Sequence, residues 1–99
     1  MPSLKIHLFG TFEVYINGTL IANQDWKTRQ TRTILKVLLA RRGQVVSSDQ
    51  IIDIVWPNDT VDSARKRLYV RISQLRNALG DFKSLVETVD GGYIFNADA

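Results

Sequence analysis

The sequence predicts an α+β fold in which an N-terminal antiparallel sheet is followed by three helices and a C-terminal β-hairpin. Three observations support this order. Apolar and polar residues alternate at the start of the chain, apolar residues recur at helical spacing in the middle, and two strand-like runs flank a glycine-rich turn near the end. The 99 residues suffice for one domain with a single core.

The N-terminal sheet is predicted from two runs in which apolar residues occupy every second position. The apolar positions of the first run are Leu4, Ile6 and Leu8. The second run extends from Phe12 to Ile16, and Asn17-Gly18 then supplies residues that tolerate positive φ in a tight hairpin turn. Residues 19–21 are therefore expected to return as a short third strand.

The first helix is predicted after Trp26, where the period of the apolar residues changes. The residues at helical spacing are Ile34, Leu35, Leu38 and Leu39. We expect Arg41 and Arg42 to form a cationic last turn, and Gly43 to close the helix with a left-handed cap.

The second helix is predicted to follow a brief extended connection at residues 45–46. Ser47, with Gln50 three residues later, fits a capping box at its start. Pro57 ends the helix, because the residue before a proline is forced out of helical geometry. Its apolar face comprises Ile51, Ile52 and Val55.

The third helix is predicted over about residues 63–79, with Asp62 or Ser63 as its N-cap and Gly80 as its stop. Its core-facing positions are Leu68, Ile72, Leu75 and Leu79. Two strands, at residues 86–88 and 93–95, then flank a turn at residues 90–92 and form the C-terminal hairpin.

The positive charge of the chain is concentrated on two of these helices. Of 13 Lys and Arg residues, six lie between Lys27 and Arg42 and five between Arg65 and Arg76, and neither segment contains Asp or Glu. Clustered cationic helices are typical of nucleic-acid-binding domains. The alternative is a pair of solvated helix faces.

The outward face of the third helix has the residue types that read a major groove. Its central positions are Lys66, Val70, Ser73 and Asn77, with Arg67 and Gln74 on one shoulder and Tyr69 on the other. Amides pair with adenine, cations reach guanine or phosphate, and an aliphatic group packs on a thymine methyl. Arg71 and Arg76 flank the core stripe and can extend toward phosphates. An ordinary amphipathic surface helix is the alternative, but such helices normally carry acidic residues.

Several segments of the chain together resemble the OmpR/PhoB-type winged-helix DNA-binding domain. They are residues 26–27, 42–47, 54–57, 70–80 and 92–93. Residues 8–14 and the Trp56-Pro57 pair look most like the antibiotic regulatory protein (SARP) branch of this family. The resemblance implies one domain over residues 1–99, within a longer transcriptional regulator.

The resemblance also implies where DNA binds. The third helix would enter the major groove and the C-terminal hairpin, or wing, would approach the minor groove. Base contacts fall on Val70 and Gln74. Contacts to the DNA backbone or groove fall on Lys66, Arg67, Arg71, Ser73, Arg76, Asn77, Thr88 and Gly91. The loop that touches RNA polymerase in some members corresponds to Trp56, Pro57, Asn58, Asp59, Thr60 and Val61.

Two positions depart from the family pattern. Asp90 stands where many relatives carry an Arg or Lys that enters the minor groove, and a carboxylate facing phosphates is unfavourable. Gln74 stands where arginine is common, and a glutamine there would favour adenine over guanine. Thr88 and Gly91 can still offer a hydroxyl and an amide to phosphate.

Residues suited to catalysis or metal binding are scarce. The chain has no cysteine and a single histidine, His7, on a predicted exposed strand position, so we expect no metal site, no cofactor and no enzymatic activity. No apolar run approaches the roughly 18 residues of a membrane span, so a cytoplasmic protein is expected. The predicted partners are double-stranded DNA and RNA polymerase. The protein is expected to bind the DNA as a dimer. The alternative is a winged-helix module that binds another protein.

Overall fold

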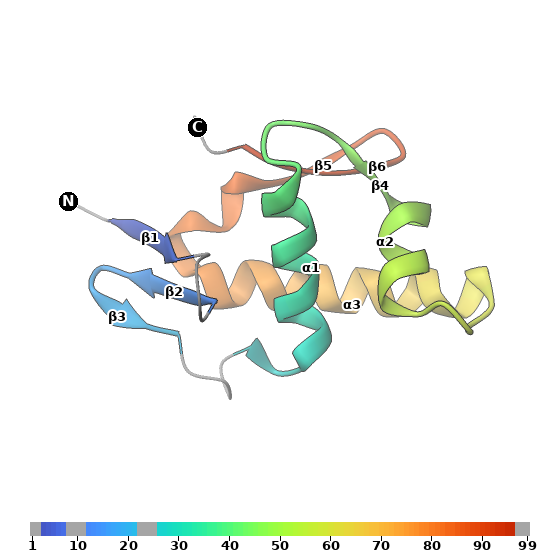
Figure 1. The fold of residues 1–99 in the computed structure, drawn as a ribbon, viewed down its shortest axis with the longest axis horizontal. Coiled ribbons are helices and arrows are strands. Elements are labelled where there is room, and N and C mark those ends of the chain that lie inside the picture. Colours follow the sequence, from blue (N-terminus) through green and yellow to red (C-terminus); the bar gives the residue numbers. More distant parts are fainter. Residues whose placement is uncertain (1–2, 8–11, 22–25, 97–99) are drawn as a thin grey trace.

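A computed structural model describes residues 3–7, 12–21 and 26–96, and these form three helices and two three-stranded antiparallel sheets. The longest helix, α3 (Val61–Leu79), runs along the long axis of the molecule (Figure 1). Helices α1 (Arg29–Ala40) and α2 (Ser48–Val55) cross in front of it, with the N-terminal sheet at one end. The α+β class and the order of sheet, helices and hairpin are confirmed.

The N-terminal sheet has the predicted antiparallel topology. Its strands are β1 (Leu4–His7), β2 (Glu13–Ile16) and β3 (Thr19–Leu20), in the order β1-β2-β3. Asn17 and Gly18 both have positive φ, at 53° and 84°, as the hairpin turn requires. His7 is exposed and packs edge-on against Tyr15. Leu8 lies outside the described residues.

Helix α1 differs from the prediction at its C-terminal end. The helix stops at Ala40, and Arg41 is already the C-cap residue, so Arg41 and Arg42 lie in the following turn instead of the last helical turn. Gly43 has a φ of 80° and its N–H donates to the Phe95 carbonyl at 3.0 Å. The left-handed glycine is confirmed, and it directs the chain toward the C-terminal sheet.

The second helix starts as predicted, whereas the third starts earlier. The Ser47 hydroxyl accepts from the Gln50 N–H and the Gln50 side chain accepts from the Ser47 N–H, which completes the capping box. Neither Asp62 nor Ser63 caps α3. Thr60 does, because its hydroxyl accepts from the Ser63 N–H, and the helix therefore begins at Val61.

The C-terminal sheet contains one strand more than the hairpin predicted from the sequence. A 3₁₀ helix, η2 (Gly80–Leu85), follows α3 and leads into β5 (Val86–Val89) and β6 (Gly92–Phe95). The connection at residues 45–46 contributes β4 (Val46–Ser47), and the strand order is β4-β6-β5. Val46 pairs with Tyr93, so the wing is attached to the segment that precedes α2.

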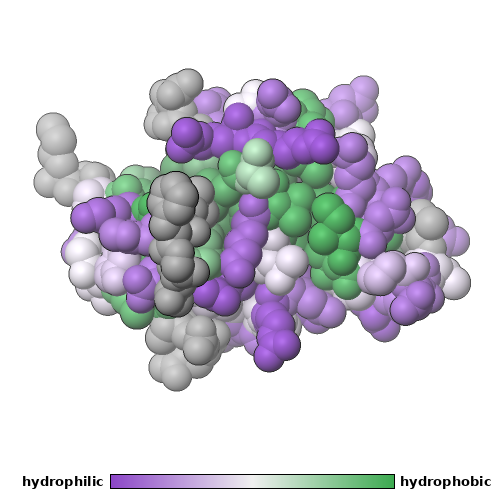
Figure 2. Space-filling view, in the orientation of Figure 1, coloured by the Kyte–Doolittle hydropathy of each residue, from purple (hydrophilic) through white to green (hydrophobic). Residues whose placement is uncertain are grey.

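The core lies between the three helices and the two sheets. Its members include the apolar stripes predicted for α1, α2 and α3, and the large aromatic residues Trp26, Trp56 and Tyr93 are 3%, 5% and 6% exposed. All three rings therefore pack within the core. On the face shown in Figure 2, hydrophobic surface gathers between α1 and α2, where Val37, Val46 and Ile54 line a shallow groove. Across the described segments, no helix combines the length and apolarity that a membrane crossing requires.

Candidate nucleic-acid interface

Helix α3 turns one face to the core and the opposite face to solvent. Leu68, Ile72, Leu75 and Leu79 are all at most 2% exposed. On the other side Tyr69 is 73% exposed and Val70 is 50% exposed. The polar positions exposed beside them are Lys66, Arg67, Ser73 and Asn77. The orientation predicted from the helical spacing is confirmed.

The basic residues near the start of α3 differ in their partners. Arg67 forms an ion pair with Asp59 in the loop before the helix, and Arg65 lies 3.9 Å from the Asp49 carboxylate on α2. Lys66 is exposed and, within the part of the chain that the structure describes, makes no ion pair or hydrogen bond. Lys66 is therefore the most available cation at this end of the helix.

Farther along α3, Arg76 joins the helix to the wing. Its guanidinium donates to the Val86 carbonyl at 2.9 and 3.0 Å and to the Thr88 hydroxyl at 2.9 Å. The structure thus brings together two residues that were predicted separately to contact the DNA backbone. Arg76 fixes β5 against α3, and the Thr88 oxygen is used as its acceptor.

Gln74 and Arg71 belong to a hydrogen-bonded network between α3 and the start of α1. The Gln74 side-chain oxygen accepts from the Thr31 hydroxyl at 3.1 Å and from Arg71 at 3.2 Å. Arg71 also donates to the Gln30 side chain at 3.0 Å, and Thr31 hydrogen-bonds the hydroxyl of Thr28, the N-cap of α1, at 3.0 Å. Gln74 is consequently half-buried, while Val70 one turn earlier is open to solvent.

A groove separates α3 from the wing. Arg65 and Tyr69 line it from the helix, one turn apart, and Thr88, Gly91 and Tyr93 line it from the wing. Burial raises the pKa of the Tyr93 hydroxyl, Tyr69 raises it further and Arg76 lowers it. Neither Arg65 nor Tyr69 was predicted to contact DNA, although their spacing of four residues places them on one helix face.

The wing carries its turn residues at an exposed tip. Asp90 and Gly91 are exposed, and Gly91 has a φ of 80°. The Gly91 carbonyl accepts from the Ser48 N–H at 3.0 Å, which ties the tip to the first residue of α2. A Cβ on Gly92 would overlap the Val46 carbonyl oxygen and lie 2.9 Å from the Ser47 Cα, so the base of the wing is packed directly on β4.

The loop predicted to touch RNA polymerase has several internal roles. Trp56 is buried, and its indole N–H has no hydrogen-bond partner among the described residues. Asp59 pairs with Arg67, and Thr60 caps α3, whose first residue is Val61. The remaining members of the predicted contact, Pro57 and Asn58, are exposed. The polymerase contact itself stays a prediction.

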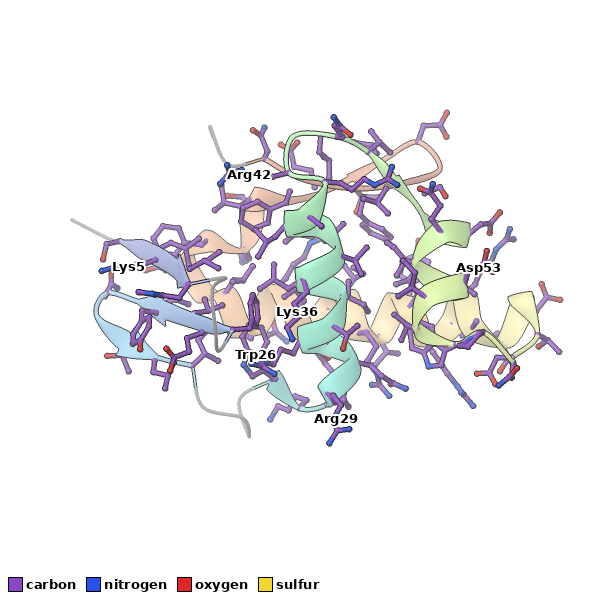
Figure 3. The ribbon with its side chains drawn as sticks, in the orientation of Figure 1. Lys5, Trp26, Arg29, Lys36, Arg42 and Asp53 are labelled. Atoms are coloured by element: carbon purple, nitrogen blue, oxygen red, sulfur yellow. The ribbon has the colours of Figure 1, made fainter. Side chains whose placement is uncertain are left out.

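The first basic segment does not form a comparable surface. Arg32 donates to the Phe12 carbonyl at 2.6 Å, and its guanidinium carbon lies 5.0 Å from the Phe12 ring centre. The Lys36 ammonium lies 5.2 Å from the same ring centre. Arg29 projects from one end of α1, Lys36 from its middle, and Arg42 lies beyond the other end (Figure 3). These cations are spread along α1, and two of them bind Phe12.

Acidic and histidine side chains do not gather into a metal site in residues 3–7, 12–21 and 26–96. The site contains cations, amides, hydroxyls and one exposed aliphatic group. Such a set can donate hydrogen bonds to phosphates and base edges.

Comparisons with known proteins identify the family and agree with the fold. The family described as "Transcriptional regulatory protein, C terminal" matches residues 25–95. Among solved structures, Mycobacterium tuberculosis EmbR, in complex with a low affinity phosphopeptide, has a TM-score of 0.83 and 24% identity to this chain. The match covers 97% of this chain and 26% of that one, so this chain spans about a quarter of EmbR. A comparison with curated proteins gives no match. The chain belongs to the family of C-terminal domains of transcriptional regulatory proteins, a DNA-binding class and not a class of enzymes.

Proposed function

We propose that this domain binds double-stranded DNA in a sequence-specific manner, with α3 in the major groove and the wing beside the adjacent minor groove. The observation that carries the proposal is the exposed face of α3, which has Val70 at its centre and continues through a groove to the wing. A major groove about 12 Å wide admits one α-helix. The DNA strand between the two grooves would then lie between α3 and the wing.

The proposed contacts form two groups: contacts that read base edges, and contacts to phosphates or sugars that position the domain on the DNA. In the proposed complex Val70 packs on a thymine methyl and Gln74 donates to a base edge. Lys66, Ser73 and Asn77 are exposed and face phosphates or sugars. Arg65 and Tyr69 contact the strand that lies in the groove between α3 and the wing.

The residues already bonded within the protein have a supporting role. Arg71 and Arg76 each retain N–H groups beyond those used internally, because a guanidinium has five donors. Arg67 reaches phosphate by exchanging its ion pair with Asp59. Thr88 and Gly91 approach the backbone from the wing, and Asp90 lowers the affinity by repelling it.

Larger assemblies are part of the proposal. We expect the domain to act within a longer regulator, to bind repeated half-sites as a dimer, and to touch RNA polymerase through the loop at residues 56–61. The cytoplasmic location expected from the sequence stays a prediction.

The proposal is tested by titrating duplex DNA at increasing salt. Each phosphate contact contributes a slope of about −0.9 to the plot of log affinity against log salt. We expect a steep linear fall and a preference for one sequence after selection from random duplexes. Binding without salt dependence, or no binding to any duplex, would contradict the proposal and favour the protein-interaction module.

A further inference from the structure

The amide of Gln74 is held in one orientation by the protein itself. A glutamine that is free in the major groove pairs with adenine through two bonds, because its oxygen accepts from N6 and its nitrogen donates to N7. The adenine preference predicted from the sequence therefore requires a free side-chain oxygen. The structure gives that oxygen two donors, Thr31 and Arg71.

The identity of the atom that faces these donors is fixed by chemistry. A guanidinium has no acceptor, so the Gln74 atom 3.2 Å from Arg71 Nη1 is the oxygen. A carbonyl oxygen has two lone pairs, and the Thr31 hydroxyl at 3.1 Å occupies the second. The Gln74 oxygen is thus saturated, and its NH₂ group is the part left for another molecule.

Thr31 is the buried member of this arrangement. Its side chain is fully buried at 0% exposed, and it is the one polar residue in the core of the described segments. Its hydroxyl lies 3.0 Å from that of Thr28, so the N-cap of α1 and the middle of α3 share one network. Arg71 is held in turn by Gln30 at 3.0 Å.

We propose that Gln74 acts on DNA as a hydrogen-bond donor only, positioned by Thr31 and Arg71, and that it therefore selects guanine. Guanine presents two acceptors, O6 and N7, on its major-groove edge, whereas adenine presents one acceptor and one donor. An NH₂ group without an available oxygen satisfies both guanine acceptors. This inference rests on the proposed placement of α3 in the major groove.

The experiment is selection of binding sites from random duplexes with the wild-type chain, Thr31→Val and Thr33→Val. Thr31→Val keeps the shape of the buried side chain and removes one donor from the Gln74 oxygen. Thr33→Val is the matched control, because among the described residues the Thr33 hydroxyl donates to the Arg29 carbonyl of its own helix and does not contact Gln74. We expect guanine at one position for the wild type and for Thr33→Val. For Thr31→Val we expect the ratio of guanine to adenine there to fall roughly tenfold.

A second variant keeps the test decisive if the buried substitution unfolds the protein. Gln74→Glu retains an oxygen for Thr31 and Arg71 and replaces the NH₂ donor by a second oxygen. The preferred base is then expected to change from guanine to cytosine, whose N4 group is a donor. A merely structural role of the network would weaken all sequences alike and leave the preferred base unchanged.

The outcomes separate this inference from the proposed function. Salt-dependent, sequence-specific binding with adenine at the Gln74 position would overturn the donor-only role and leave the DNA-binding proposal intact. Guanine that persists in both Thr31→Val and Gln74→Glu would overturn it as well. Loss of all duplex binding by the wild-type chain would refute the proposed function, and the inference with it.

Discussion

Helices α1 and α3 are both rich in Lys and Arg, and Asp62 in the first turn of α3 is the one acidic residue in either, yet the structure uses their positive charges differently. On α1, Arg32 and Lys36 lie against the Phe12 ring and connect the helix to the N-terminal sheet. On α3, Lys66 is open to solvent beside the exposed Val70. Positive charge in a sequence therefore indicates a binding surface only where the surrounding fold leaves it unpaired.

The two helices bury their apolar sides to a similar degree and differ in what covers their other faces. Four of the five buried positions on α1 are 0% exposed, and the fifth, Leu39, is 9% exposed. Helix α1 also packs against α2, α3 and β6, whereas the central positions on the outward face of α3 are exposed, namely Lys66, Val70, Ser73 and Asn77. We conclude that α1 serves the stability of the domain, whereas the outward face of α3 presents the proposed contacts. The following predictions test that division, from the largest expected effect to the smallest.

The largest effect is expected from truncation in the core of α1. Leu38→Ala is expected to lower the free energy of unfolding by about 2–5 kcal/mol, because Leu38 is fully buried and the change leaves a cavity. Val70→Ala on the exposed face of α3 is expected to change it by less than about 0.5 kcal/mol while weakening specific DNA binding. Denaturant titration and duplex binding measure the two quantities. Similar stability losses from both changes would refute the division.

A smaller effect is expected from the cations of α1. Arg32→Ala removes a charged hydrogen bond to the Phe12 carbonyl and a cation–π contact, which we expect to cost about 1–3 kcal/mol of stability. Arg29→Ala, three residues earlier on the same helix, is the control, because the Arg29 side chain is exposed. Thermal unfolding compares the two variants. Equal melting temperatures would show that the Phe12 contacts contribute nothing.

The third prediction compares one lysine from each helix. Lys66→Ala is expected to weaken binding to every duplex by a few-fold and to reduce the salt slope by about 1, because one phosphate contact is lost. Lys36→Ala removes the same charge from α1 and is expected to leave the salt slope unchanged. Fluorescence anisotropy at several salt concentrations gives both values. The comparison fails if Lys36→Ala reduces the slope as much as Lys66→Ala does.

The smallest effect is expected at the tip of the wing. Asp90→Arg is expected to tighten DNA binding slightly and to increase the salt slope by about 1, because a repulsive carboxylate becomes a cation near the backbone. Asp81→Arg makes the same change of charge at an exposed position on η2 and serves as the control. Unchanged affinity for Asp90→Arg would mean that the wing tip stays away from DNA.

The parts of the fold that could be predicted from the sequence depend on local patterns. The core stripe of α3 follows from helical periodicity, and the Ser47–Gln50 capping box follows from a spacing of three residues. The predicted start of α3 was wrong because the sequence contains three suitable N-cap residues close together, Thr60, Asp62 and Ser63. The choice among them depends on which hydroxyl or carboxylate meets a free N–H in three dimensions.

The parts that could not be predicted join residues far apart in the chain. Thr31 and Gln74 are 43 residues apart, and Arg76 and Thr88 are 12 apart. Neither pair has a sequence pattern, because each depends on how two elements cross. Helical periodicity correctly predicted which residues of the site are exposed. Their hydrogen-bond partners depend on tertiary packing, and these partners determine which donors and acceptors each side chain has left.

The base of the wing has a consequence for how this domain can change over evolution. Position 92 accommodates glycine alone, since any side chain there would collide with the backbone of β4. Position 90, two residues away at the exposed tip, meets no such barrier. The hairpin thus combines a base that requires glycine at position 92 with a tip where the residue at position 90 can change. Mutation can reverse the charge at the tip without disturbing the scaffold that carries it.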